Sequence, residues 1–140
     1  MNAREAKQAA AEAAARDARL HAILALRPAR LSAEVEIEWQ ALAGTLADDP
    51  PSWAPSRRYA ALLNEYCIER VNERQLRLQL ATPAAQLVRE TTPSGAVKVK
   101  VSPFVPLLEA SLKRLRELTD MLELSPRGAR QAKRKIFDAA

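Results

Sequence analysis

The sequence contains few of the residues from which most enzyme active sites are built. It has three glycines, one histidine (His21) and one cysteine (Cys67). Neither GxxxxGK[ST] nor GxGxxG occurs, so the common Gly-rich phosphate-binding loops are excluded. A single His and a single Cys cannot make a zinc site, a disulfide or an oriented Cys–His dyad. We therefore expect a protein that is not an enzyme, with no catalytic residue, metal or cofactor.

Long apolar runs are also missing. No stretch of 18 apolar residues occurs, and the N-terminus has no apolar segment of the kind found in secretory signals. We expect a soluble protein that stays inside the cell. The acidic groups Asp48-Asp49 and Glu34, Glu36 and Glu38 have no His or Lys partner nearby, so they are better explained as solvated faces than as metal ligands or acid–base pairs.

The apolar residues that are present are mostly alanine. Apolar residues make up 48% of the 140, but 28 of them are Ala, and 11 of these lie in the first 25 residues. The 39 larger apolar residues can build one core, which is thin for this length. The composition therefore predicts one domain whose core neighbouring subunits help to complete.

Positive charge is concentrated at the two ends of the chain. The net charge of +5 divides into +3 for residues 1–31, −3 for 32–82, +1 for 83–124 and +4 for 125–140. Basic ends are typical of polyanion binding, most often to nucleic acid, although a solubilising tail has the same composition. The predicted DNA contacts are Arg16, Arg19, Arg27 and Arg30 near the N-terminus and Arg127, Arg130, Lys133, Arg134 and Lys135 in the tail.

Two helices are predicted before residue 50. Residues 3–26 have high helix propensity but a weak apolar stripe, in which only Leu20, Ile23, Leu24 and Leu26 could dock, so we expect a fraying or partner-dependent helix. Ser32 caps the next helix, whose buried face is Val35, Trp39, Leu42 and Leu46. Residues 18–47 could hold a helix-turn-helix, but the three glutamates of the second helix would repel phosphates. We assign that helix to structure or to contacts with basic neighbours.

A proline-rich linker at 50–56 precedes a long helix at 57–81. Trp53 in the linker is interpreted as a packing anchor. Cys67 is expected to be a buried structural thiol, and the like-charge pairs Glu69/Glu73 and Arg70/Arg74 need opposite charges nearby. The predicted apolar side of the long helix is Tyr59, Leu62, Leu63, Tyr66, Cys67, Val71 and Leu78.

Residues 86–101 change to strand periodicity, with valines at 97, 99 and 101 and a Thr-Pro-Ser-Gly turn before them. Gly95 supplies the positive φ of this turn. An isolated two-stranded hairpin is marginal in water, so we expect it to pack on helices or to pair between subunits. Lys98 and Lys100 are further candidate DNA contacts, lining a tunnel, although the pattern slightly favours a solvated position.

A leucine-rich helix begins at Ser102-Pro103, and a short basic helix begins at Ser125-Pro126. The leucine stripe of the first can serve the core or an oligomer interface, and spacing alone does not decide between them. We favour the interface, made by Leu108, Leu112, Leu115, Leu118 and Leu122 together with Tyr66 and Val71.

The order of these landmarks resembles the small subunit of phage terminases, in the family whose members end in a "lGLTPssRxR" motif. The resemblance covers residues 28–135: the Leu31-Ser32 cap, Glu38-Trp39-Gln40-Ala41-Leu42, the Thr-Pro-Ser-Gly hairpin and the final Leu-rich helix. The closing motif matches at Leu124, Pro126 and Arg130, with Ser125 for Thr and Glu123 for Gly.

The resemblance implies a mainly α fold, a helical protomer with one small β-hairpin that assembles into a homo-oligomeric ring. Together with the charge distribution, it divides the chain into a basic arm (1–30), an oligomerisation core (31–124) and a basic tail (125–140). The implied function is to bind viral double-stranded DNA at the packaging start and to recruit or regulate the large terminase subunit, the ATPase and nuclease of genome packaging. The implied setting is the host cytoplasm during phage assembly. The alternatives are a basic DNA-binding regulator and a structural phage adaptor without a DNA role.

Overall fold

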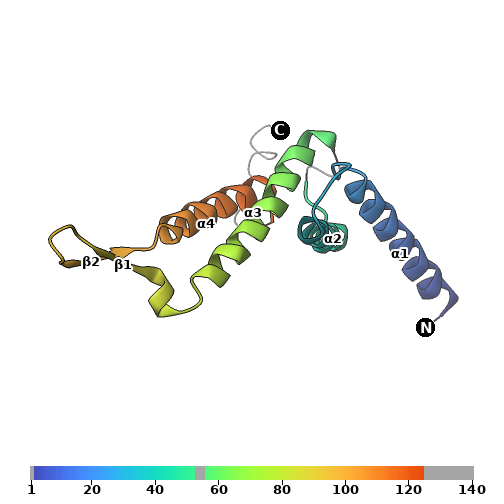
Figure 1. Cartoon of the computed structure of the whole chain (residues 1–140). Helices are drawn as coiled ribbons and strands as arrows, with labels where there is room; N and C mark the ends of the chain where they lie inside the picture. Colours follow the sequence, from blue (N-terminus) through green and yellow to red (C-terminus); the bar gives the residue numbers. More distant parts are fainter. Residues whose placement is uncertain (1, 53–55, 125–140) are drawn as a thin grey trace, which may run out of the picture.

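The computed structural model describes residues 2–52 and 56–124, and Figure 1 shows their arrangement. In chain order these residues form α1 (Ala3–Leu24), α2 (Ala33–Asp48), a 3-10 turn η1 (Arg57–Tyr59), α3 (Ala60–Gln79), a 3-10 turn η2 (Pro83–Gln86), β1 (Leu87–Thr91), β2 (Val97–Val101) and α4 (Phe104–Met121). The predicted mainly α class with one β-hairpin is confirmed. Trp53 and the tail 125–140 lie outside the described residues.

Helix α2 is the centre of the fold. It is seen end-on in Figure 1, while α1 leaves on one side and α3 and α4 run together on the other. Trp39 is fully buried, and its indole Nε1 donates a hydrogen bond to Asn64 Oδ1 of α3 at 3.2 Å. The predicted buried face of this helix is confirmed, because Val35, Leu42 and Leu46 join Trp39 in the core.

Local caps explain where the first two helices begin. Asn2 Oδ1 accepts from the Glu5 backbone amide at 2.8 Å, and Glu5 returns a bond to the Asn2 amide, so α1 begins with a capping box. Ser32 Oγ accepts from the Val35 amide, as predicted. Of the whole of α1 only Ile23 is buried, and Leu20, Leu24 and Leu26 pack beside it, so the helix is anchored at its C-terminal end alone.

The leucine stripe of α4 is divided between core and surface. Leu115, Leu118 and Leu122 are buried inside the chain, as is Val71 of α3. Their assignment to an oligomer interface is therefore wrong for this fold, because α3 and α4 pack antiparallel and use these side chains against one another and the neighbouring core. Leu108, Leu112 and Tyr66 are half-buried, and their place in an oligomer interface stays a prediction.

Two further expectations are corrected at the far end of α3. Leu78 is 72% exposed, because α3 extends past α2 and this part of the helix has no partner on that side. Of the two alternatives for the hairpin, packing on the helices is contradicted, since all ten residues of β1 and β2 are exposed, and pairing between subunits stays a prediction. The hairpin itself is as predicted, antiparallel with Leu87 opposite Val101 and with Gly95 at φ 84° in the turn.

The C-terminal end of α4 is held by an unusual glutamate. Glu123, where the terminase motif has Gly, adopts φ 58°, and the amide of Leu124 donates to Thr119 O at 2.9 Å as in a Schellman motif. The Glu123 carboxylate accepts from the Ser52 amide at 2.9 Å and from the Ser52 hydroxyl. These bonds offset the strain of a left-handed residue. They also hold Ser52, in the connection that follows α2, against the end of α4.

The buried face of α2 can be tested by truncation. We expect Leu46→Ala to lower the free energy of unfolding by about 2–5 kcal/mol, because the side chain is 2% exposed and a cavity would remain. Ile37→Ala on the same helix is the matched control, since Ile37 is 66% exposed and its loss should change stability by less than about 0.5 kcal/mol. Urea unfolding followed by circular dichroism measures both, and equal effects would contradict the assignment.

Glu123 permits a second test. Glu123→Gly and Glu123→Ala both remove the bonds to Ser52, but only glycine adopts positive φ without a Cβ penalty. We therefore expect Glu123→Ala to be less stable than Glu123→Gly by about 1 kcal/mol. Equal stabilities in urea unfolding would show that residue 123 does not hold the left-handed conformation in solution.

Candidate nucleic-acid and subunit interfaces

Three of the four arginines predicted near the N-terminus to contact DNA are used to hold α1 on α2. Arg16 pairs with Asp48, and this hydrogen bond holds the pKa of the Asp48 carboxyl below its usual range. Arg19 donates from Nε and Nη2 to Ala47 O at 2.9 and 2.7 Å, satisfying a carbonyl at the end of α2. Arg27 pairs with Glu36 and donates to Leu24 O at 2.8 Å. Their partners leave these guanidinium groups less available to phosphates.

Arg30 differs from these three. It is exposed and forms no ion pair with another residue in the described part of the chain. On the hairpin, Lys98 is likewise exposed, whereas Lys100 Nζ lies 2.8 Å from Glu90 Oε2. The five tail residues Arg127, Arg130, Lys133, Arg134 and Lys135 lie outside the described residues.

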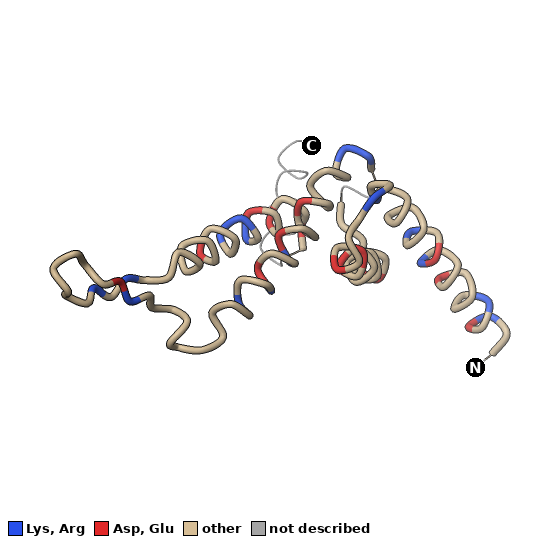
Figure 2. The backbone as a smooth tube through the Cα atoms, in the orientation of Figure 1, with Lys and Arg blue, Asp and Glu red and all other residues tan. Residues whose placement is uncertain are grey.

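Four further cations are also exposed. Arg4 and Lys7 lie on the unpacked half of α1, and Arg57 and Arg58 lie in η1 at the start of α3. In Figure 2 the blue segments follow α1 and recur at the bend where α3 begins. Arg57 and Arg58 were not predicted as DNA contacts because the net charge of residues 32–82 is negative. An Arg-Arg pair with no acidic residue between Asp49 and Glu65 would have indicated them.

The glutamates of α2 have structural partners. Glu38 is only 9% exposed and pairs with Arg74, so it is not part of a solvated face. Glu34 Oε2 accepts from Gln75 Nε2 at 2.9 Å. The assignment of this acidic helix to structure and to basic neighbours is confirmed, and α2 is unsuited to lie against phosphates.

Helices α3 and α4 are joined by side-chain hydrogen bonds as well as by apolar contacts. Arg114 Nε donates to Glu65 Oε1 at 2.7 Å, and this hydrogen bond lowers the pKa of Glu65. Ser111 Oγ donates to Glu69 Oε2 at 2.8 Å. Glu73 is met by Arg70 and Arg77 of its own helix. The like-charge pairs of α3 therefore find opposite charges or hydrogen-bond donors, as their spacing requires.

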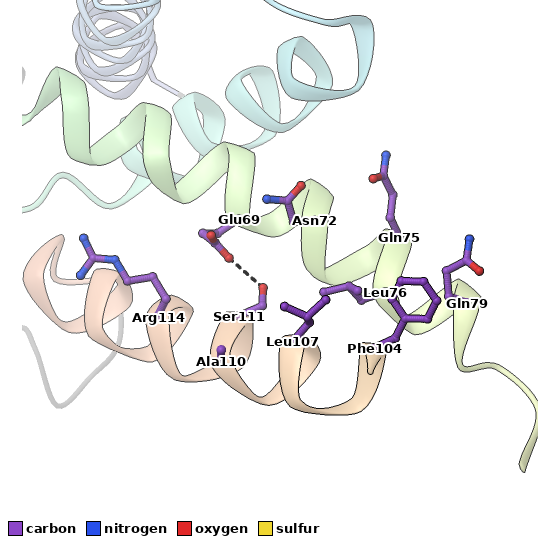
Figure 3. A pocket seen from close by; sticks show the side chains of 10 residues that line it. All are labelled: Glu69, Asn72, Gln75, Leu76, Gln79, Phe104, Leu107, Ala110, Ser111 and Arg114. Atoms are coloured by element: carbon purple, nitrogen blue, oxygen red, sulfur yellow. Dashed lines mark hydrogen bonds between the residues drawn. The ribbon is translucent and has the colours of Figure 1, made fainter. Parts of the chain in front are cut away.

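An open groove of about 620 Å³ runs between α3 and α4. Figure 3 shows Leu76, Phe104 and Leu107 along it, with the Ser111–Glu69 hydrogen bond toward its other end. Phe104 and Leu107 remain 41% and 54% exposed. The groove is an apolar surface with a polar rim.

Other chemistry is not indicated by the described residues. Among them no three His, Cys, Asp or Glu side chains are grouped to bind a metal, and no helix is long and apolar enough to span a membrane. Cys67 is fully buried, and burial raises the pKa of its thiol to about 12, so it is a core residue as predicted. No protein-family model matches the chain, and neither the curated proteins nor the solved structures contain a significant match.

The Glu65–Arg114 contact gives a testable pH dependence. Because the pKa of Glu65 is lower in the folded chain, its contribution to stability is present above the ordinary value near 4.5 and is lost as the pH falls through the folded pKa. We expect Glu65→Gln to lower the urea midpoint at neutral pH and to match the parent protein at a pH of about 2–3. Exposed Glu109 of α4 provides the control, since Glu109→Gln should show no such convergence.

Proposed function

We propose that this protein is the DNA-binding small subunit of a phage terminase, a non-enzymatic homo-oligomer that binds viral double-stranded DNA and regulates the large subunit. The observation that carries the proposal is the order of sequence landmarks from Leu31-Ser32 to Arg130. The helical protomer, with a hairpin inserted between its last two described helices, has the element content that this resemblance implies. The proposed setting is the host cytoplasm during phage assembly.

The charge distribution supports the DNA-binding part of the proposal. The acidic groups of the body are largely paired internally, while exposed cations occur on α1, in η1 and on the hairpin. Contacts of this kind bind phosphates without reading sequence. Repetition of a weak phosphate contact around an oligomer would strengthen binding through avidity. The surface fits a subunit that holds DNA for a partner enzyme.

Salt-dependent binding tests the proposal and separates the cations. We expect the affinity for a fluorescent DNA duplex to fall linearly on a log–log plot against salt, with a shallower slope after deletion of residues 125–140. Arg30→Gln and Lys7→Gln should each reduce the slope by about 1. Arg16→Gln is the matched control: it should lower thermal stability through loss of the Asp48 pair and leave the slope almost unchanged.

Each alternative function predicts a different outcome. A structural adaptor would form oligomers without measurable DNA affinity, and a DNA-binding regulator would bind DNA without stimulating or inhibiting the ATPase of a large terminase subunit. Full-length protein of the same preparation should be measured for native mass, DNA affinity and effect on that ATPase. A monomer with no affinity for DNA would overturn the proposal.

A further inference from the structure

Exposed apolar side chains are concentrated at the hairpin end of the molecule. Among the described residues, eleven large hydrophobic side chains are exposed, and eight of them fall between residues 78 and 107. We call these eight the distal apolar surface: Leu78, Leu87, Val88, Val97, Val99, Val101, Phe104 and Leu107. Figure 1 shows that the hairpin projects from the helices, far from the N-terminus of α1. Concentration of this kind on one part of a surface marks an interaction site.

The hairpin has one mainly apolar face and one mainly charged face. Leu87 lies opposite Val101 and Arg89 opposite Val99, so the face that carries Arg89 and Thr91 also carries four apolar side chains, Leu87, Val97, Val99 and Val101. All four are more than half exposed. Glu90, Lys98 and Lys100 lie on the other face with Val88. A two-stranded ribbon of this kind is marginal in water, which indicates that further strands or a surface cover its apolar side.

Both edges of the hairpin are free to pair. The amides of Thr92 and Ser102 donate to Ala96 O and Gln86 O at 2.8 Å, which identifies the hydrogen-bonded positions of the ladder. By alternation, Leu87, Arg89 and Thr91 direct their backbone groups to one edge, and Val97, Val99 and Val101 direct theirs to the other. None of these six residues is proline, so each edge presents three donors and three acceptors.

The charges select which strand can be added. If two copies joined β2 to β2 over their full length, Lys98 would lie opposite the Lys100 of the other copy. If they joined β1 to β1, the two Arg89 side chains would be opposite. Like charges directly opposite are destabilising. If β1 of one copy joins β2 of the next in the register of the hairpin itself, Glu90 meets Lys98 on one face. On the other face the four apolar side chains of each copy continue into the next, with Arg89 opposite Val99.

We propose that the hairpin is a self-assembly element, in which β1 of one copy pairs antiparallel with β2 of the next and leaves the same edges free for another copy. The interface is heterologous, so repetition closes into a ring when the rotation allows it. Exposed Phe104 and Leu107 lie at the base of the hairpin and extend the apolar surface toward the α3–α4 groove. The inference rests on the self-assembly in the proposed function and not on its DNA binding.

Cysteine pairs give a test specific to this arrangement. In a Cys67→Ala background, one chain carries Arg89→Cys and a second, tagged chain carries Val99→Cys, so no disulfide can form within a chain. A hydrogen-bonded antiparallel pair has Cα atoms about 5.5 Å apart, within disulfide range. We expect a disulfide-linked heterodimer when the two chains are co-expressed and oxidised, and none when either chain is expressed alone.

The remaining outcomes of the cross-linking count against the proposal. Homodimers of the Val99→Cys chain alone would show β2–β2 pairing, homodimers of the Arg89→Cys chain would show β1–β1 pairing, and no cross-link at all would show that another surface or partner covers the hairpin. Replacing Val99→Cys by Ser94→Cys in the exposed turn controls for random collision and should give no heterodimer.

An edge proline tests the same contact without cysteine. The Val99 amide faces the open edge, so Val99→Pro keeps the hydrogen bonds of the hairpin and removes one donor from the new pair. We expect native mass measurements to show at least tenfold weaker association than for Val99→Thr, which retains the amide. Unchanged association of Val99→Pro would overturn the inference, while an unchanged DNA salt slope would leave the proposed function intact. Cross-linked protein without DNA affinity would support the strand pairing and overturn the DNA binding of the proposed function.

Discussion

The position of α2 across the other helices is the constraint on which the structure depends. Its fully buried Trp39 is bonded to Asn64 of α3, and the same helix receives the C-terminal end of α1 on its other side. The core has few large residues outside this crossing. One helix therefore organises α1 and α3, and the parts farthest from it, the start of α1 and the hairpin, have almost no buried side chains.

Ion pairs also join the helices that pack against one another. Arg16 and Arg27 attach α1 to α2, Arg74 reaches from α3 to Glu38 of α2, and Arg114 joins α4 to α3. Most of these pairs are substantially exposed and so contribute modestly to stability, but they fix the relative positions of helices that share a thin core. They also neutralise arginine side chains that would otherwise be available to bind a polyanion. The net charge of the chain therefore overstates the basic surface available to DNA.

The start of α1 and the hairpin, which lie far apart in the structure, suit the proposed assembly in different ways. The first half of α1 is an exposed helix held by its cap and its propensity, with cations spaced along it. The hairpin carries exposed apolar side chains, and their contact with water is unfavourable. The first suits a polyanion and the second suits a strand of another copy, so the DNA contact proposed on α1 and the proposed subunit contact lie far apart in one protomer.

The sequence by itself determined the helices, the hairpin and the buried face of α2, because these depend on local propensity, caps and periodicity. The Val-Lys alternation and Gly95 specified the hairpin, and the spacing of Trp39 and Leu46 specified a buried stripe. Only the tertiary structure decided which stripes are used within the chain. Leu118 and Leu122 are core residues because α3 lies against them. Leu78 is exposed because it lies on the part of α3 that extends past α2. Likewise, Arg16 and Arg30 look alike in sequence, and only packing places a carboxylate beside the first.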